Sequence, residues 1–102
     1  MNYIHVLISA ENRKEVDKII DVLLEKRLIA GSLITKGPSK LWWKGKIVEL
    51  TYFNISAFTI NKHKKAIAEE VKKISKEEVP IIAFFDMEGN KEFLSWIDEN
   101  IA

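Results

Sequence analysis

The chain has 102 residues, enough for one domain with a modest core, and 47% of them are hydrophobic against 30% charged. Its 16 basic and 15 acidic residues are well mixed and leave a net charge of +1, which argues against a nucleic-acid-binding protein with a basic face. There is no cysteine, no signal-peptide pattern in the first twenty residues and no apolar run near the roughly 20 residues of a membrane span. We therefore expect one cytoplasmic domain over residues 1–102, with no nucleic-acid or membrane partner.

A strand and a helix are the first predicted elements. Residues 3–8 form an apolar run rich in β-branched side chains, which predicts a central strand that is buried on both faces and ends at Ser9. Asn12 then offers a helix N-cap, and Glu15 is placed to complete a capping box. Apolar residues recur at helical spacing up to Leu28, so a helix is predicted over this segment.

A long hairpin follows the helix. Residues 28–34 predict a strand, Gly37-Pro38 predicts a bulge or bend, and the strand resumes to Trp43. Lys44-Gly45 predicts a tight turn in which glycine supplies the positive φ. The second arm, residues 46–60, would span about 50 Å at roughly 3.3 Å per residue, against a radius of gyration of about 13 Å for a domain of this size. We expect the hairpin to extend beyond its own core.

The apolar pattern of the second arm changes phase near Tyr52. Val48, Leu50 and Tyr52 share one parity, and the apolar residues from 53 to 57 share the other. The change predicts a bulge, or two halves that face different partners. We expect the domain's own helices to cover the near half and another subunit to cover the tip half.

The remaining pattern completes a known arrangement. Residues 61–75 predict a helix capped by Asn61, residues 81–85 a strand, and Gly89-Asn90 the start of a last helix. The order is β-α-β-β-α-β plus a terminal helix. This is an α+β fold of the ferredoxin-like, split β-α-β type, with an antiparallel sheet, helices on one face and an extended hairpin.

Few residues indicate chemistry. Trp42 and Trp43 either pack in a core or subunit interface, or form the aromatic wall of a small-ligand pocket. Asp86 and Glu88 either bind a hard cation or favour the start of the last helix. The chain shows no phosphate loop, no metal-ligand spacing and no nucleophile beside a base. We therefore predict no catalytic residue, no metal ligand and no cofactor, and expect a protein that is not an enzyme.

Four segments resemble the CutA1 divalent-cation tolerance family. They are residues 23–30 (LLEKRLIA), the run WWKGKI at 42–47, EVP at 78–80 before an apolar strand, and GN at 89–90 followed by FLSWI at 93–97. Their order and spacing extend the resemblance over positions 4–101. It implies a ferredoxin-like fold, a homotrimer held together by the long hairpins, and a role in divalent-cation (copper) tolerance or homeostasis, with ions or small ligands bound between subunits.

Carried over onto this chain, the resemblance gives two sets of residues. The trimer interface is predicted at Trp42, Trp43, Val48, Leu50 and Tyr52. The ligand cleft is predicted at Trp43, Glu49, Tyr52 and Glu77.

The copper-binding side chains proposed for the family have almost no counterpart here. Gly31 stands where the family commonly has Cys, Tyr52 where a Glu is common, and Ser75-Lys76-Glu77 where His-Pro-Tyr precedes the fourth strand. Copper, a soft or borderline cation, therefore lacks its preferred ligands, and we expect weak or absent binding at that site. Two other functions stay open: a PII-like trimer that binds a small ligand or nucleotide, and a purely structural trimer.

Overall fold

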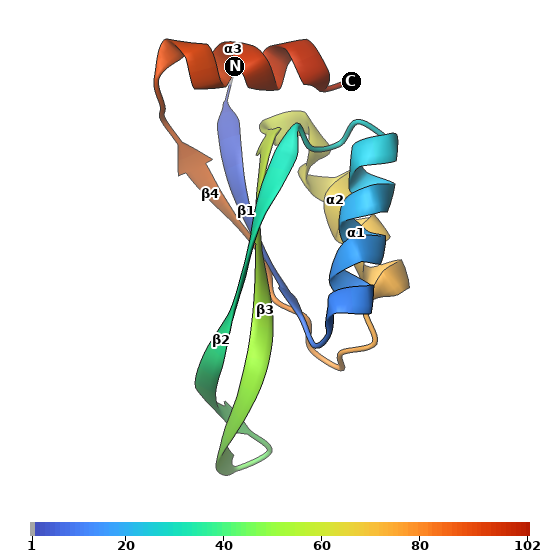
Figure 1. The fold of residues 1–102 in the computed structure, drawn as a ribbon, viewed down its shortest axis with the longest axis vertical. Coiled ribbons are helices and arrows are strands. Elements are labelled where there is room, and N and C mark those ends of the chain that lie inside the picture. The colour runs from blue at the N-terminus through green and yellow to red at the C-terminus, as the bar shows by residue number, and fades with distance from the viewer. Residues whose placement is uncertain (1) are drawn as a thin grey trace.

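A computed structural model describes residues 2–102, and its elements follow the predicted order (Figure 1). They are β1 (Tyr3–Ala10), α1 (Arg13–Glu25), β2 (Gly31–Trp43), β3 (Lys46–Ile60), a 3-10 turn (Asn61–His63), α2 (Lys64–Ile74), β4 (Ile82–Met87) and α3 (Lys91–Asn100). All strand pairs are antiparallel and the sheet order is β2-β3-β1-β4, which confirms the ferredoxin-like α+β prediction. Within residues 2–102, no helix is both long and apolar enough to cross a membrane.

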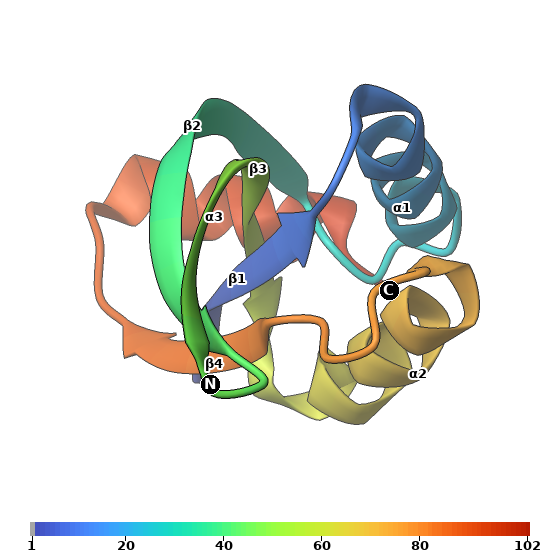
Figure 2. The ribbon, with the colours of Figure 1, turned by 90° about the horizontal axis from the view of Figure 1, so that it is seen from below.

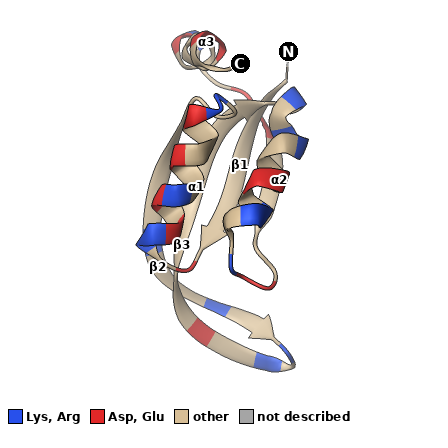
Figure 3. Cartoon of the chain, turned by 90° about the vertical axis from the view of Figure 1, so that its right-hand side faces the viewer, with Lys and Arg blue, Asp and Glu red and all other residues tan. Residues whose placement is uncertain are grey.

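The core lies between the sheet and the helices α1 and α2, which cover one face of it (Figure 3). β1 is a central strand, as predicted, and its residues Ile4, Val6 and Ile8 are fully buried on the helix side. On the other side, His5 and Leu7 are only half-buried. The prediction that this strand is buried on both faces is therefore wrong for the single chain, because α1 and α2 pack on one face only.

The two predicted helix caps have different outcomes. Asn12 caps α1, and its side chain accepts a hydrogen bond from the Glu15 backbone N–H at 2.9 Å. Asn61 does not cap α2 with its side chain, so that prediction is wrong. Its backbone N–H instead donates to the Asn2 carbonyl at 3.0 Å, and the chain enters α2 through the 3-10 turn.

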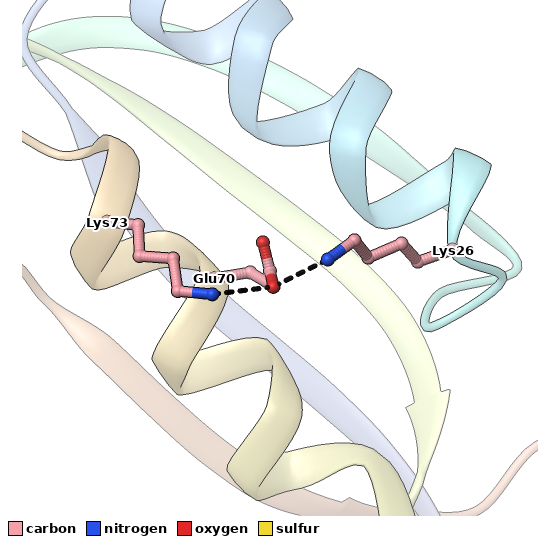
Figure 4. A network of polar contacts seen from close by, with 3 residues as sticks. All are labelled: Lys26, Glu70 and Lys73. Atoms are coloured by element: carbon pink, nitrogen blue, oxygen red, sulfur yellow. Dashed lines mark hydrogen bonds and ion pairs between the residues drawn. The ribbon is translucent and has the colours of Figure 1, made fainter.

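An ion-pair network joins the C-terminal end of α1 to α2 (Figure 4). Glu70 Oε1 accepts from Lys26 Nζ at 2.8 Å and from Lys73 Nζ at 3.3 Å. The hydrogen bond from Lys26 is the main reason that the pKa of the Glu70 carboxyl lies below its ordinary value. The network therefore favours the ionised carboxylate in the folded chain.

The hairpin pairs without interruption, from Gly31 opposite Phe58 to Trp43 opposite Lys46. No bulge forms at Gly37-Pro38, because Pro38 lies on the edge strand β2, where a missing N–H is tolerated. Lys44 and Gly45 both have positive φ, 49° and 79°, as a two-residue type I′ turn requires. The tip extends past the helices (Figure 1), and the strands coil when viewed from below (Figure 2). The longest extent of the whole chain is 43 Å, shorter than the roughly 50 Å of a straight 15-residue arm.

The phase change near Tyr52 reflects a change of covered face rather than a bulge. Ile55 and Ala57 point toward α1 and α2 and are fully buried. Val48, Leu50 and Tyr52 have the opposite parity, so they belong to the face that α1 and α2 leave uncovered. We call this side of the sheet the open face.

An aromatic row crosses the open face. His5 stacks between Phe58 and Phe85, with ring centroids 6.3 and 5.8 Å away. α3 covers one end of this face: its Phe93 meets Phe58 edge-on at 5.1 Å, and its Trp96 lies over Gly31, where an added Cβ would come within 2.6 Å of the indole. Beyond α3 the open face stays accessible, and Phe85 retains 49% of its surface.

Candidate functional site

A cavity of about 330 Å³ lies between the outer half of the hairpin and the segment that leads into β4. We call it the Trp43 cavity. The hairpin and two loop segments line it with Glu11, Leu41, Trp43, Val48, Leu50, Tyr52, Glu77, Glu78 and Val79. Three of the four residues predicted for a ligand cleft, Trp43, Tyr52 and Glu77, are thus brought together within one chain.

Strand parity explains which hairpin residues reach the cavity. Trp43 and Tyr52 both belong to the open face, and the coiled hairpin carries that face over the segment before β4. Glu49 has the other parity and forms an exposed ion pair with Lys40 at 3.0 Å. Glu49 therefore lies outside the cavity.

The residues predicted for a subunit interface divide between the two faces of the hairpin. Trp43, Val48, Leu50 and Tyr52 line the cavity. Trp42 faces the other way, opposite Ile47 in the ladder, and the two are 73% and 63% exposed. The hairpin tip thus presents an uncovered apolar pair on the side away from the cavity.

The turn of the hairpin places an ammonium group against two of the residues that line the cavity. Lys44 Nζ lies 5.5 Å from the centroid of the Trp43 ring and 3.4 Å from Glu78 Oε2. Contact with an indole face and a carboxylate is the arrangement that favours an organic cation. Both Lys44 and Glu78 are exposed, so their ion pair contributes little to stability.

Hydrogen bonds hold Glu77 in the cavity wall. The Ser9 hydroxyl donates to Glu77 Oε2 at 2.9 Å and accepts from the Ile81 backbone N–H, also at 2.9 Å. The nearby carboxylates also affect the pKa of the neighbouring Tyr52 phenol. Burial, hydrogen bonding to Glu77 and the charges of nearby carboxylates raise the pKa of Tyr52 to about 12. The phenol therefore stays neutral at physiological pH.

A buried carboxyl lies close to this wall. Glu15 in the first turn of α1 is only 7% exposed, and its Oε1 has no hydrogen-bond partner. Burial, followed by the charge of Glu77, raises the pKa of Glu15, and hydrogen bonds from Lys76 and Ser75 only partly oppose the increase. Negative charge therefore accumulates at this end of the sheet.

The described part of the chain does not offer a dense metal site. Among residues 2–102, no group of three or more His, Asp or Glu side chains is close enough to hold a metal ion. Asp86 and Glu88 line a separate open cleft beside Tyr3, and their two side chains are the only carboxylates among its described lining residues. His5 lies between phenyl rings, whereas His63 Nε2 contacts the Ala102 carbonyl at 2.7 Å. These residues do not fit a copper centre, which prefers several nitrogen or sulfur ligands.

Sequence reasoning missed two acidic members of the cavity, Glu11 and Glu78. Neither belongs to a strand or helix, and only the coiling of the hairpin brings them near Trp43. The consecutive acids Glu77 and Glu78 before Pro80 are a local signal, but their proximity to an indole depends on tertiary structure.

Comparison with known proteins gives consistent matches along almost the whole chain. Residues 4–100 match the family model described as CutA1 divalent ion tolerance protein. A divalent-cation tolerance protein CutA of Archaeoglobus fulgidus is 37% identical over 97 residues, which are 94% of this chain and 95% of that protein. The corresponding protein of Thermus thermophilus is 32% identical over 97 residues, covering 93% and 94% of the two chains.

Solved structures match equally well. The CutA structure of A. fulgidus, described as periplasmic, has a TM-score of 0.93 at 34% identity and covers 98% of this chain and 99% of its own. The Cut A1 structure of T. thermophilus has a TM-score of 0.92 at 29% identity, with the same coverage. A CutA1 structure from Oryza sativa reaches a TM-score of 0.93 at 21% identity, a likeness of fold.

Proposed function

The chain belongs to the CutA1 divalent ion tolerance family, and from that premise we propose that it acts in divalent-cation tolerance as a homotrimer, without catalysing a reaction. The relatives it matches are named for divalent-cation tolerance. The proposed location is the cytoplasm, which cell fractionation tests.

One observation carries the proposed assembly: the open face is apolar, accessible and almost uncharged. The residues of β1 on this face and their cross-strand neighbours include no Asp, Glu, Lys or Arg. Figure 3 shows many charged residues on α1 and α2, which cover the opposite face of the sheet. Leu33 and Phe85 keep 64% and 49% of their surface exposed. An accessible apolar surface of this kind is typical of a subunit interface, and a second copy of the chain is the proposed partner.

The hairpin supports the same assembly. Trp42 and Ile47 form an exposed apolar pair at the tip, where α1 and α2 do not reach. Large aromatic residues frequently carry much of the binding energy at interfaces. Contact of this pair with a neighbouring subunit would explain why the hairpin extends beyond its own core.

Light scattering tests the assembly. We expect a particle of three times the 11.8 kDa chain mass at micromolar concentration. Leu33→Glu should dissociate it, because the substitution buries an unpaired charge in the interface while leaving the single-chain core intact. Leu24→Glu is the matched control, since Leu24 is an exposed leucine on α1. A monomeric native protein, or an unchanged mass for Leu33→Glu, would refute the proposed interface.

Copper is proposed to bind weakly. The chain has no cysteine, and its two histidines lie in separate surroundings. A calorimetric titration that gave stoichiometric, submicromolar copper binding would overturn this part of the proposal.

The Trp43 cavity favours a second candidate function, the binding of a small ligand. Its three carboxylates would repel a nucleotide phosphate, so this observation does not favour the nucleotide-binding variant of a PII-like trimer. A thermal-shift screen tests the choice, because a ligand at a hundred times its Kd adds about 2.7 kcal/mol of stability. A purely structural trimer would show no shift with any ligand.

A further inference from the structure

We propose that a groove between the start of α1 and the end of α2 binds a phosphate group that carries a proton. The groove has a volume of about 200 Å³. Figures 1 and 3 show the start of α1 and the end of α2 at the same end of the helix layer. The residues that line the groove are Asn12, Lys14, Glu15, Lys18, Ile74 and Lys76. None of them belongs to the open face or to the hairpin, so the proposal goes beyond the role in cation tolerance and does not depend on the trimer.

The first observation is a buried hydrogen-bond acceptor in the groove wall. Glu15 retains only 7% of its surface, and within the described part of the chain its Oε1 has no hydrogen-bond partner. The terminal torsion of a glutamate side chain is soft, so a small rotation turns this oxygen toward a ligand in the groove. Because an unsatisfied buried acceptor is costly, a ligand that donates a hydrogen bond to Oε1 gains binding energy.

The second observation is the positive charge beside this carboxyl. Lys14, Lys18 and Lys76 all line the groove, and none of the three forms an ion pair within residues 2–102. Among the lining residues, three ammonium groups therefore accompany the one carboxyl of Glu15. The groove favours an anion, and the anion has to offer a hydrogen-bond donor as well.

The helix N-terminus adds to the attraction for an anion. α1 has 13 residues and begins directly after Asn12, so its first turn carries partial positive charge. Asn12 caps the helix through its carbonyl oxygen Oδ1, and its amide nitrogen is a further donor. At the end of α2, Lys76 offsets the partial negative charge of that helix C-terminus.

A protonated phosphate group has both properties that the groove requires. It is an anion, and its P–O–H group can donate to Glu15 Oε1. Sulfate has a similar size and charge but no proton, so its oxygens would face the Glu15 carboxylate without a hydrogen bond. Burial, the charge of Glu77 and the weaker effect of Glu11 raise the pKa of Glu15, which makes its carboxylate a better acceptor for that proton. Three lysines balance a hydrogen phosphate dianion together with the Glu15 carboxylate.

Calorimetric titration with sodium phosphate at pH 6 and fixed ionic strength tests the proposal. We expect saturable one-to-one binding per chain, with sulfate at least about tenfold weaker, because a site built to accept a hydrogen bond rejects an analogue that lacks the donor. Methyl phosphate, of which about half is protonated at this pH, distinguishes the two sources of the group. Tighter binding than inorganic phosphate would identify a monoester, and weaker binding the free ion. Absence of saturable binding of either phosphate up to millimolar concentration, or equally tight binding of sulfate, would refute the proposal.

Glu15→Gln provides a test that loss of folding cannot imitate. The amide is uncharged and can donate as well as accept, so sulfate should bind more tightly than to the native chain, and the preference for phosphate should largely disappear. Glu11→Gln is the matched control, because Glu11 is an exposed acid near Glu15 that does not line the groove. It should change the affinities for both anions by a similar factor. An unchanged preference in Glu15→Gln would refute the role given to the carboxyl.

Lysine variants locate the site. Lys18→Gln should weaken phosphate binding several-fold, whereas Lys65→Gln, which removes an exposed lysine near the start of α2, should have little effect. Equal effects of the two substitutions would refute the assignment to this groove. Light scattering on the same samples keeps this result separate from the proposed assembly. Phosphate binding without a trimer would refute only the assembly, and a trimer without phosphate binding would refute only this proposal.

Discussion

Replacing Glu15 by glutamine should stabilise the protein near neutral pH. Glu15 is almost fully buried in the first turn of α1, and one of its carboxyl oxygens has no partner. The ionised carboxylate loses its hydration on burial and lies near the charge of Glu77, whereas a neutral amide of the same shape avoids both costs; each unit by which such effects raise a pKa corresponds to about 1.4 kcal/mol. A negative charge near a helix N-terminus recovers about 0.3–1 kcal/mol, which is the smaller effect. The net expectation is a gain on the order of 1 kcal/mol for the neutral side chain.

The raised pKa of Glu15 determines how the effect of this substitution on stability depends on pH. Because the pKa of Glu15 is raised in the folded chain, the native protein loses stability as pH rises from the ordinary carboxyl range through the raised value. Below that range the native Glu15 is neutral, and the advantage of the glutamine variant should disappear. With about 2.1 cal/mol/K of unfolding entropy per residue, a gain of 1 kcal/mol raises the Tm of a chain this long by roughly 5 °C.

Thermal unfolding at pH 7 and at pH 4, at one fixed protein concentration, measures both quantities. Asp21→Asn serves as the control, since Asp21 is an exposed acid on the same helix. We expect a higher Tm for Glu15→Gln at pH 7 only, and little change for the control. A Glu15→Gln variant that melts at or below the native protein at pH 7, or that is shifted equally at both pH values, would refute this reasoning.

Three further substitutions test other features of the fold. Thr59→Val should cost about 1–3 kcal/mol in urea unfolding, because the fully buried Thr59 hydroxyl donates to the Leu28 carbonyl at 2.6 Å; an unchanged midpoint would contradict that role. Gly45→Ala should cost about 1–2 kcal/mol, because φ at Gly45 is 79°; an unaltered Tm would argue against the type I′ turn. Glu70→Gln should lower the Tm at pH 7, and the difference should vanish as pH falls through the lowered pKa of the Glu70 carboxyl; a constant difference down to strong acid would exclude the ion pair with Lys26 as its cause.

Local pattern was enough to predict most of the fold. The second arm of the hairpin spans Lys46–Ile60 as predicted, because its β-branched and aromatic residues are bounded by a Lys-Gly turn and a helix start. The cap at Asn61 was wrong because Asn61 lies within the 3-10 turn that precedes α2, and its backbone N–H pairs with Asn2 near the N-terminus. A hydrogen bond between residues so far apart in the sequence cannot be predicted from the local pattern.

The candidate site was less predictable. The parity of the second arm could have shown that Glu49 does not share a cavity with Tyr52, since the two have opposite parity in an unbroken strand. No local pattern could have placed Glu11 and Glu78 near Trp43, because the coiling of the hairpin joins segments that are distant along the chain. Secondary structure was thus readable from side-chain alternation, whereas the cavity depends on the curvature of the sheet.

The uninterrupted ladder of the hairpin limits how its length can change during evolution or engineering. Trp42 and Trp43 are adjacent, yet one faces outward and the other lines the cavity. Because side chains alternate with a period of two, inserting one residue before the turn would exchange the two faces over every position between the insertion and the tip. Inserting two residues would preserve both faces and only lengthen the arm. Viable length variants of this hairpin should therefore differ by even numbers of residues in each strand.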